Sequence, residues 1–158
     1  MILWLHVLAA ITWVGGMVFL LAVLAPLFHG TLPAREEIQI AYGAGRRYQF
    51  VVARAMEVLL VTGILAIVFR GGKGAGVSHG FWQILALKVL GFLVMAALQT
   101  WQRISMNRQL APLLIAGGGG ILGEQQWRAI LSRMTQVTRW NLGIGVVMVL
   151  LGLLLRAR

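Results

Sequence analysis

The side chains that could do chemistry in this sequence are a few ionisable groups set within long apolar runs. His6 stands one helical turn inside the first run, Lys88 stands inside the third, and Arg139 stands near the start of the fourth. An ionisable group at the centre of a bilayer is costly unless it is paired or solvated. These positions are therefore the first places to look for a functional site.

His6 is the most informative of these residues. Trp13 follows it at i+7 and Gly16 three residues later, which places all three on one helical face. A histidine here can ligate haem iron or copper, or take part in proton transfer. The alternative is an interfacial histidine that hydrogen-bonds a neighbouring helix or water. His29 lies roughly 34 Å further along a helix, so it cannot share a metal ion with His6.

Lys88 has two interpretations. Its long stem could carry the ammonium group to the outer interface. Alternatively, the cation pairs with a porphyrin propionate or a quinone oxygen. Phe92, Met95 and Gln99 follow it on the same helical face, which indicates that this face points into the protein.

Charged residues on the other side of the membrane can pair locally. Arg54 and Glu57 are one turn apart, and Arg139 could compete for the same carboxylate. We predict that Glu57 is paired with Arg54 or Arg139, because an unpaired buried carboxylate is costly. A structural ion pair is favoured over a proton relay. Arg139 and Asn141 could also bind an anion or a quinone.

Each apolar run contributes one methionine near mid-membrane: Met17, Met56, Met95 and Met148. Soft thioethers can bind copper, and Met148 and His79 are candidate second ligands beside His6. However, no paired Met or His-Met motif is present. Core filling is the favoured role of these methionines.

The composition shows what must position these groups. Of the 158 residues, 59% are hydrophobic and 11% are charged, which indicates a bilayer as the solvent. The absence of cysteine excludes disulfides and thiolate metal sites. The net charge of +10 indicates membrane topology and contact with anionic lipid rather than nucleic acid.

The apolar runs predict an all-α fold: an integral membrane, antiparallel four-helix bundle that makes one domain over residues 1–158. A crossing needs about 20 apolar residues. The predicted spans are 2–26, 50–69, 81–101 and 137–155. Residues 124–136 predict either a short amphipathic helix on the membrane surface or an N-terminal extension of the fourth helix.

Arginine and lysine are concentrated on one side of the predicted bundle, in and beside the loops that follow the first and third helices. The positive-inside rule places this side in the cytoplasm, and both termini in the periplasm, of a bacterial-type inner membrane. Small residues on the fourth helix, Gly143, Gly145 and Gly152, permit close packing within the bundle or with another subunit. A homo- or hetero-oligomer is therefore expected.

Three stretches carry a resemblance to a known family, and the fourth apolar run, from Arg139, fits it loosely. LHVLAAITWVGGMVFLLAVLAPLFH resembles the opening helix of the copper-resistance D (CopD) membrane domain and the related HemJ-type protoporphyrinogen oxidases. RRYQFVVARAMEVLLVTGILAIVFR is similar to their second helix, with its basic start and Thr-Gly step. LALKVLGFLVMAALQTWQRISMNRQLAPLL is similar to their lysine-centred third helix.

The resemblance implies that His6 is a haem ligand and that Lys88 and Arg139 are the charged residues that oxidase-type members need. The chain departs from the oxidase type in two places. It has VFLLAVLAP where that type continues through Phe-Tyr-Leu-Pro-Arg, and its fourth helix has Asn141 but not the Asn-Glu-x-Pro run. The general CopD-type domain is therefore the closer match.

Three classes of function follow. The first is a haem b or porphyrin redox protein that exchanges electrons with membrane quinone, as a quinone-linked oxidoreductase would. The second is a copper-handling protein in which His6, His79 and the amino end of Met1 collect copper on the outer face. The third is a non-catalytic subunit of a larger membrane complex. The haem hypothesis ranks first, because the chain lacks the paired Met and His ligands expected of a copper carrier.

Overall fold

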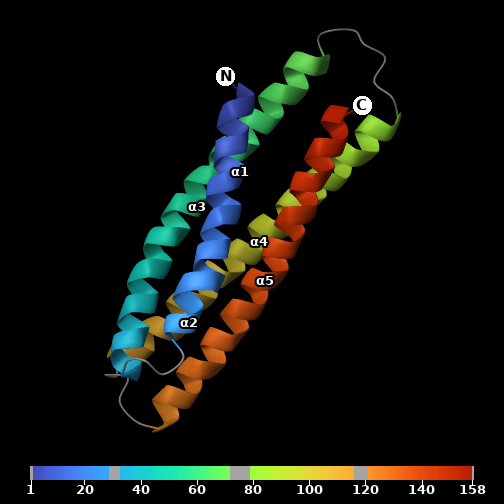
Figure 1. Cartoon of the computed structure of the whole chain (residues 1–158). Helices are drawn as coiled ribbons and strands as arrows, with labels where there is room; N and C mark the ends of the chain where they lie inside the picture. The colour runs from blue at the N-terminus through green and yellow to red at the C-terminus, as the bar shows by residue number, and fades with distance from the viewer. Residues whose placement is uncertain (1, 29–32, 72–78, 116–120, 158) are drawn as a thin grey trace.

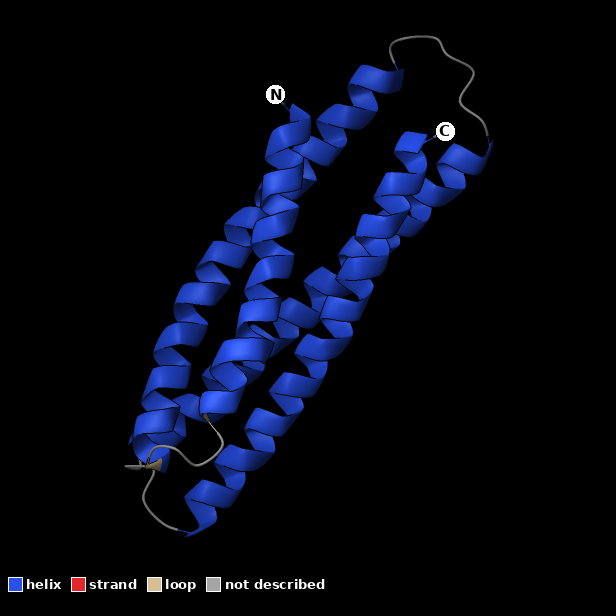
Figure 2. Ribbon diagram, viewed as in Figure 1, coloured by secondary structure: helices blue, strands red, loops and turns tan. Residues whose placement is uncertain are grey.

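A computed structural model describes residues 2–28, 33–71, 79–115 and 121–157. Nearly all of these residues are helical, as Figure 2 shows. The elements are α1 (Ile2–Phe19), a π-helical segment η1 (Leu20–Leu24), α2 (Ala25–Leu27), α3 (Ala34–Gly71), α4 (His79–Ile115) and α5 (Ile121–Ala157). Because α1, η1 and α2 follow one another directly, they form one rod.

Within the described residues, four helical segments are long and apolar enough to cross a membrane: Ile2–Leu27, Arg35–Phe69, Trp82–Pro112 and Gly123–Leu153. Large apolar side chains cover their outward faces, including Leu8, Val61 and Leu93. Such a surface suits hydrocarbon rather than water. The prediction of an all-α four-helix bundle is confirmed, and the helices indicate an integral, multi-pass membrane protein.

The bundle consists of two antiparallel pairs. α1 packs mainly against α3, and α4 packs mainly against α5 (Figure 1). The start of α1 and the end of α5 lie at the same end of the bundle. The arginine-rich segments lie toward the opposite end, which is called the basic end below.

The helices are longer than the predicted spans. α3 begins at Ala34 rather than near residue 50, with Glu36 and Glu37 in its first turn, where carboxylates interact favourably with the helix dipole. The backbone N–H groups of both residues donate to the Pro33 carbonyl, at 2.9 and 3.1 Å. A hydropathy window detects the length that crosses hydrocarbon, not the length of the helix, so it missed this extension.

Residues 124–136 do not form a separate surface helix. They belong to the continuous helix α5, as the alternative prediction stated. Trp127 is buried, packs edge-on against Phe28 with ring centroids 5.9 Å apart, and donates to Glu37 Oε2 at 2.9 Å. The apolar side of this segment therefore faces the bundle rather than a membrane surface.

Two apolar clusters hold the bundle together. The membrane cluster is formed by buried residues of α1, α3 and α4: Ala9, Trp13, Met17, Val52, Ala55, Leu59 and Met95. The basic-end cluster is formed by Phe28, Ile38, Met106, Leu110 and Trp127. Met56 and Met148 pack against the membrane cluster, so core filling by the four mid-membrane methionines is confirmed.

Glycines allow the closest approaches between helices. A Cβ at Gly16 would lie 2.7 Å from the Tyr48 ring, so α3 reaches α1 only because this side chain is absent. Gly145 faces Met95 and Met17, and Gly152 faces Lys88, within the bundle. A Cβ at Gly143 would meet nothing within 4 Å among the described atoms. Two of the three small residues on α5 thus serve packing inside the chain.

Candidate functional site

His6 is held by a residue of the neighbouring helix. Its Nδ1 lies 2.8 Å from Thr62 Oγ1 on α3. The Thr62 hydroxyl donates its single hydrogen to the Val58 carbonyl, 2.5 Å away. Thr62 Oγ1 must therefore accept a hydrogen bond from His6 Nδ1–H. In the neutral ring this places the proton on Nδ1 and leaves on Nε2 the lone pair that can accept a hydrogen bond or bind a metal.

Lys88 enters the same layer of the bundle from α4. Its Nζ lies 3.2 Å from the position that a Cβ at Gly152 would occupy, so the ammonium group rests against the backbone of α5. The side chain is half-buried, and its charge is close enough to interact electrostatically with His6. The structure thus places one imidazole and one cation in the half of the bundle away from the basic end.

Trp13 and Met148 lie next to this layer. Trp13 is 2% exposed, and its ring meets Phe92 edge-on at 5.9 Å. Its Nε1 has no hydrogen-bond partner among the described atoms. Met148 lies one turn from Gly152 and packs over Gly91, which leaves room for its sulfur and terminal methyl group. The Met148 side chain therefore fills space between α4 and α5.

The remaining predicted site residues lie elsewhere. Arg139 is exposed and stands roughly 20 Å along α5 from Gly152, so it does not form one site with Lys88. His79 begins α4, but its side chain lies outside the described part of the structure. Met1 and His29 also fall outside the described residues.

The prediction that Glu57 pairs with an arginine is confirmed. Arg54 Nη1 lies 2.7 Å from Glu57 Oε2, on the outer face of α3. Both side chains are more than half exposed. The pair cancels two charges beside exposed apolar side chains such as Val58 and Val61.

A layer of buried polar side chains joins α3, α4 and α5, and the sequence predicted only part of it. Asn141 of α5 is fully buried and donates from Nδ2 to Gln99 Oε1 of α4 at 3.2 Å. The Tyr48 hydroxyl of α3 is buried close to Gln99. One turn further, Gln102 donates to Thr138 Oγ1 at 2.9 Å. The sequence predicted that Gln99 faces the interior of the bundle, but it did not predict that Asn141 of α5 is its partner.

Asn141 Oδ1 has no hydrogen-bond partner among the described atoms, and the Tyr48 hydroxyl lies near Gln99 without meeting it in good hydrogen-bonding geometry. Reversing the Asn141 amide alone would set two acceptor oxygens against each other, and reversing both amides would keep one bond but leave Asn141 Nδ2 unpaired. Unpaired polar atoms inside a bundle are costly. The bundle thus buries polar groups of Asn141 and Tyr48 next to the apolar membrane cluster.

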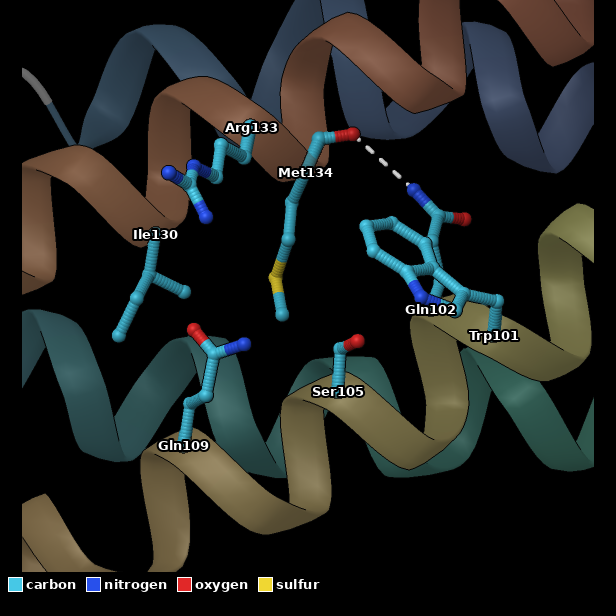
Figure 3. A pocket seen from close by; sticks show the side chains of 7 residues that line it. All are labelled: Trp101, Gln102, Ser105, Gln109, Ile130, Arg133 and Met134. Atoms are coloured by element: carbon cyan, nitrogen blue, oxygen red, sulfur yellow. Dashed lines mark hydrogen bonds between the residues drawn. The ribbon is translucent and has the colours of Figure 1, made fainter.

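Two cavities adjoin these groups. The larger, of about 310 Å³, is a groove between α3 and α4, here called the α3–α4 groove. It is lined by Gln49, Val52, Ala53, Met56, Glu57, Leu60, Phe92, Gln99, Thr100 and Arg103. The smaller, of about 30 Å³, lies between α4 and α5 (Figure 3). Ser105 and Gln109 of α4 and Arg133 of α5 line it, and it has about the volume of one water molecule.

Among the described residues, no group of three or more His, Cys, Asp or Glu side chains could together hold a metal ion. His6 is thus a single nitrogen donor, with Lys88 nearby. Comparison with known proteins returned no matching family model, no matching curated protein and no matching solved structure.

Proposed function

We propose that the protein is a membrane-embedded b-type haem redox protein that exchanges electrons with membrane quinone. In this proposal His6 supplies an axial nitrogen ligand through Nε2. Lys88 supplies the positive charge that stabilises a haem propionate or a quinone oxygen. The bundle supplies a dry environment that is continuous with the bilayer in which quinone moves.

The observation that carries the proposal is the bond from His6 Nδ1–H to Thr62 Oγ1. Histidines that ligate metals usually donate their second ring N–H to a fixed acceptor, which sets the tautomer and the orientation of the ring. Thr62 provides such an acceptor, because its own hydrogen is committed to α3.

Part of the His6 ring is open to its surroundings. The nearest glycine, Gly63, leaves His6 Cε1 3.8 Å from the position of its missing Cβ. The His6 side chain is only half-buried, so the ring is not enclosed by protein on all sides. Haem b would supply a one-electron donor and acceptor at this position.

A spectroscopic experiment tests the proposal. Protein purified in mild detergent should show a Soret band and, after reduction, the bands of a b-type haem. His6→Ala should abolish them, whereas His29→Ala, 23 residues further along the chain, should leave them unchanged. A quinol gives up two electrons and two protons, so one quinol should reduce two haem-bearing chains.

The opposite results would reject the proposal. Equal spectra for His6→Ala and the parent protein would remove His6 as the ligand. Colourless protein that binds copper, and loses it on the same substitution, would replace the haem function with copper handling. Protein that binds neither and copurifies with a fixed partner would instead be a structural subunit.

A further inference from the structure

The α3–α4 groove has a polarity gradient along its length. Thr100 and Arg103 lie toward the basic end of α4, and Phe92 lies roughly 16 Å away from Arg103, toward the opposite end. On the antiparallel helix α3, Gln49 lies nearest the basic end and Leu60 furthest from it. The groove is therefore most polar toward the basic end, on the side of the adjacent headgroups. Glu57, one turn from Leu60, is the exception among its apolar lining residues, and it is paired with Arg54.

The charge of the groove is carried by one residue. Glu57 is neutralised by Arg54 at 2.7 Å. Among the described residues, Arg103 forms no ion pair and no hydrogen bond. A guanidinium group offers five N–H donors to an anion. The polar end of the groove is thus a positive site without a protein counter-charge.

Amide groups stand beside this cation. Gln49 donates to the Met106 sulfur at 3.8 Å, and a thioether is a weak acceptor. Gln99 is 7% exposed and is held by Asn141, which fixes one polar wall of the groove. At the other end, the Phe92 ring is braced edge-on by Trp13. Both ends therefore have walls fixed by neighbouring helices.

We propose that the α3–α4 groove binds one anionic phospholipid from the leaflet at the basic end. The phosphate group contacts Arg103 and the neighbouring glutamine amides. One acyl chain runs along Val52, Ala53, Met56 and Phe92. The site is separate from His6 and does not depend on the proposed haem.

The test compares lipid binding by native mass spectrometry and by exchange of labelled lipid in detergent micelles. The probes are phosphatidylglycerol and phosphatidylcholine with identical acyl chains. The unmodified protein should retain one phosphatidylglycerol in preference to phosphatidylcholine. Arg103→Gln should weaken phosphatidylglycerol binding about fivefold, as expected for one arginine at an anionic surface.

Matched variants separate the groove from general surface charge. Arg108→Gln removes an exposed arginine of the same helix that does not line the groove, and should leave binding unchanged. Ala53→Phe fills the apolar part without changing charge and should displace the lipid. Arg103→Lys should retain most of the binding. Far-UV circular dichroism and gel filtration confirm that each variant folds.

Three results would overturn the proposal. Equal losses in Arg103→Gln and Arg108→Gln would indicate diffuse attraction to lipid. Equal retention of the two lipids would show that Arg103 does not select an anion. Full displacement by inorganic phosphate alone would show that a free anion, rather than a phospholipid, is the ligand.

Discussion

The substitution Thr62→Val tests the arrangement that defines the candidate site. Valine has nearly the shape of threonine but cannot accept the hydrogen bond from His6 Nδ1–H, which spans 2.8 Å in the structure. The ring then loses the acceptor that sets its tautomer and orientation. We expect the protein to fold, with a loss of about 1 kcal/mol, the usual net value of one neutral hydrogen bond.

The effect on ligand binding should be larger. Loss of a group that orients a metal-ligating histidine typically weakens binding about 10–100-fold, which corresponds to roughly 1.4–2.8 kcal/mol. Haem titration of the unliganded protein, followed at the Soret band, measures this change. Nitrogen-15 NMR of the same protein should show His6 protonated at Nδ1 and unprotonated at Nε2, and Thr62→Val should redistribute the proton.

Thr12→Val is the matched control. Thr12 also donates to the carbonyl four residues earlier, Leu8, at 2.8 Å, but it is exposed and does not contact His6. It should lose the same type of backbone bond without a change in haem affinity or in the NMR signals of His6. If both valine variants bind haem equally, or if Nε2 carries the proton in the parent protein, the reasoning from Thr62 is wrong.

Three further predictions concern packing and topology. Gly16→Ala should destabilise the bundle by about 1–3 kcal/mol, because its Cβ would lie 2.7 Å from the Tyr48 ring. Gly15→Ala is the control, because a Cβ there meets nothing within 4 Å. Equal denaturation midpoints of the two variants in detergent would contradict this packing. Trp127→Phe should lower the free energy of unfolding by about 1.5–3 kcal/mol, because it removes the hydrogen bond to buried Glu37. Trp140→Phe, at an exposed position, should lower it little. Thermal unfolding followed by circular dichroism compares the two variants, and equal losses would contradict the role of the Glu37 bond. A reporter active only in the periplasm should work when fused after Arg158 and fail when inserted at residues 116–120. If a reporter active only in the cytoplasm works after Arg158 instead, the predicted orientation is reversed.

The sequence by itself determined the features that depend on local spacing. Apolar runs of membrane length predict the helices, since each backbone polar group in hydrocarbon must be satisfied within its own helix. The Arg54–Glu57 pair was predictable because residues three apart are neighbours on any helix. The concentration of arginine at one end also follows directly from the order of the spans.

The tertiary structure decided which faces meet. Thr62 is 56 residues from His6, and nothing in the sequence around either residue indicates their contact. The same is true of Gln99 with Asn141, and of Trp127 with Glu37, which turns a predicted surface segment toward the core. Hydropathy defines which residues cross the membrane, but the rotation and axial register of each helix are set by side-chain packing against its neighbours. Those two quantities place Lys88 beside α5 and open the α3–α4 groove.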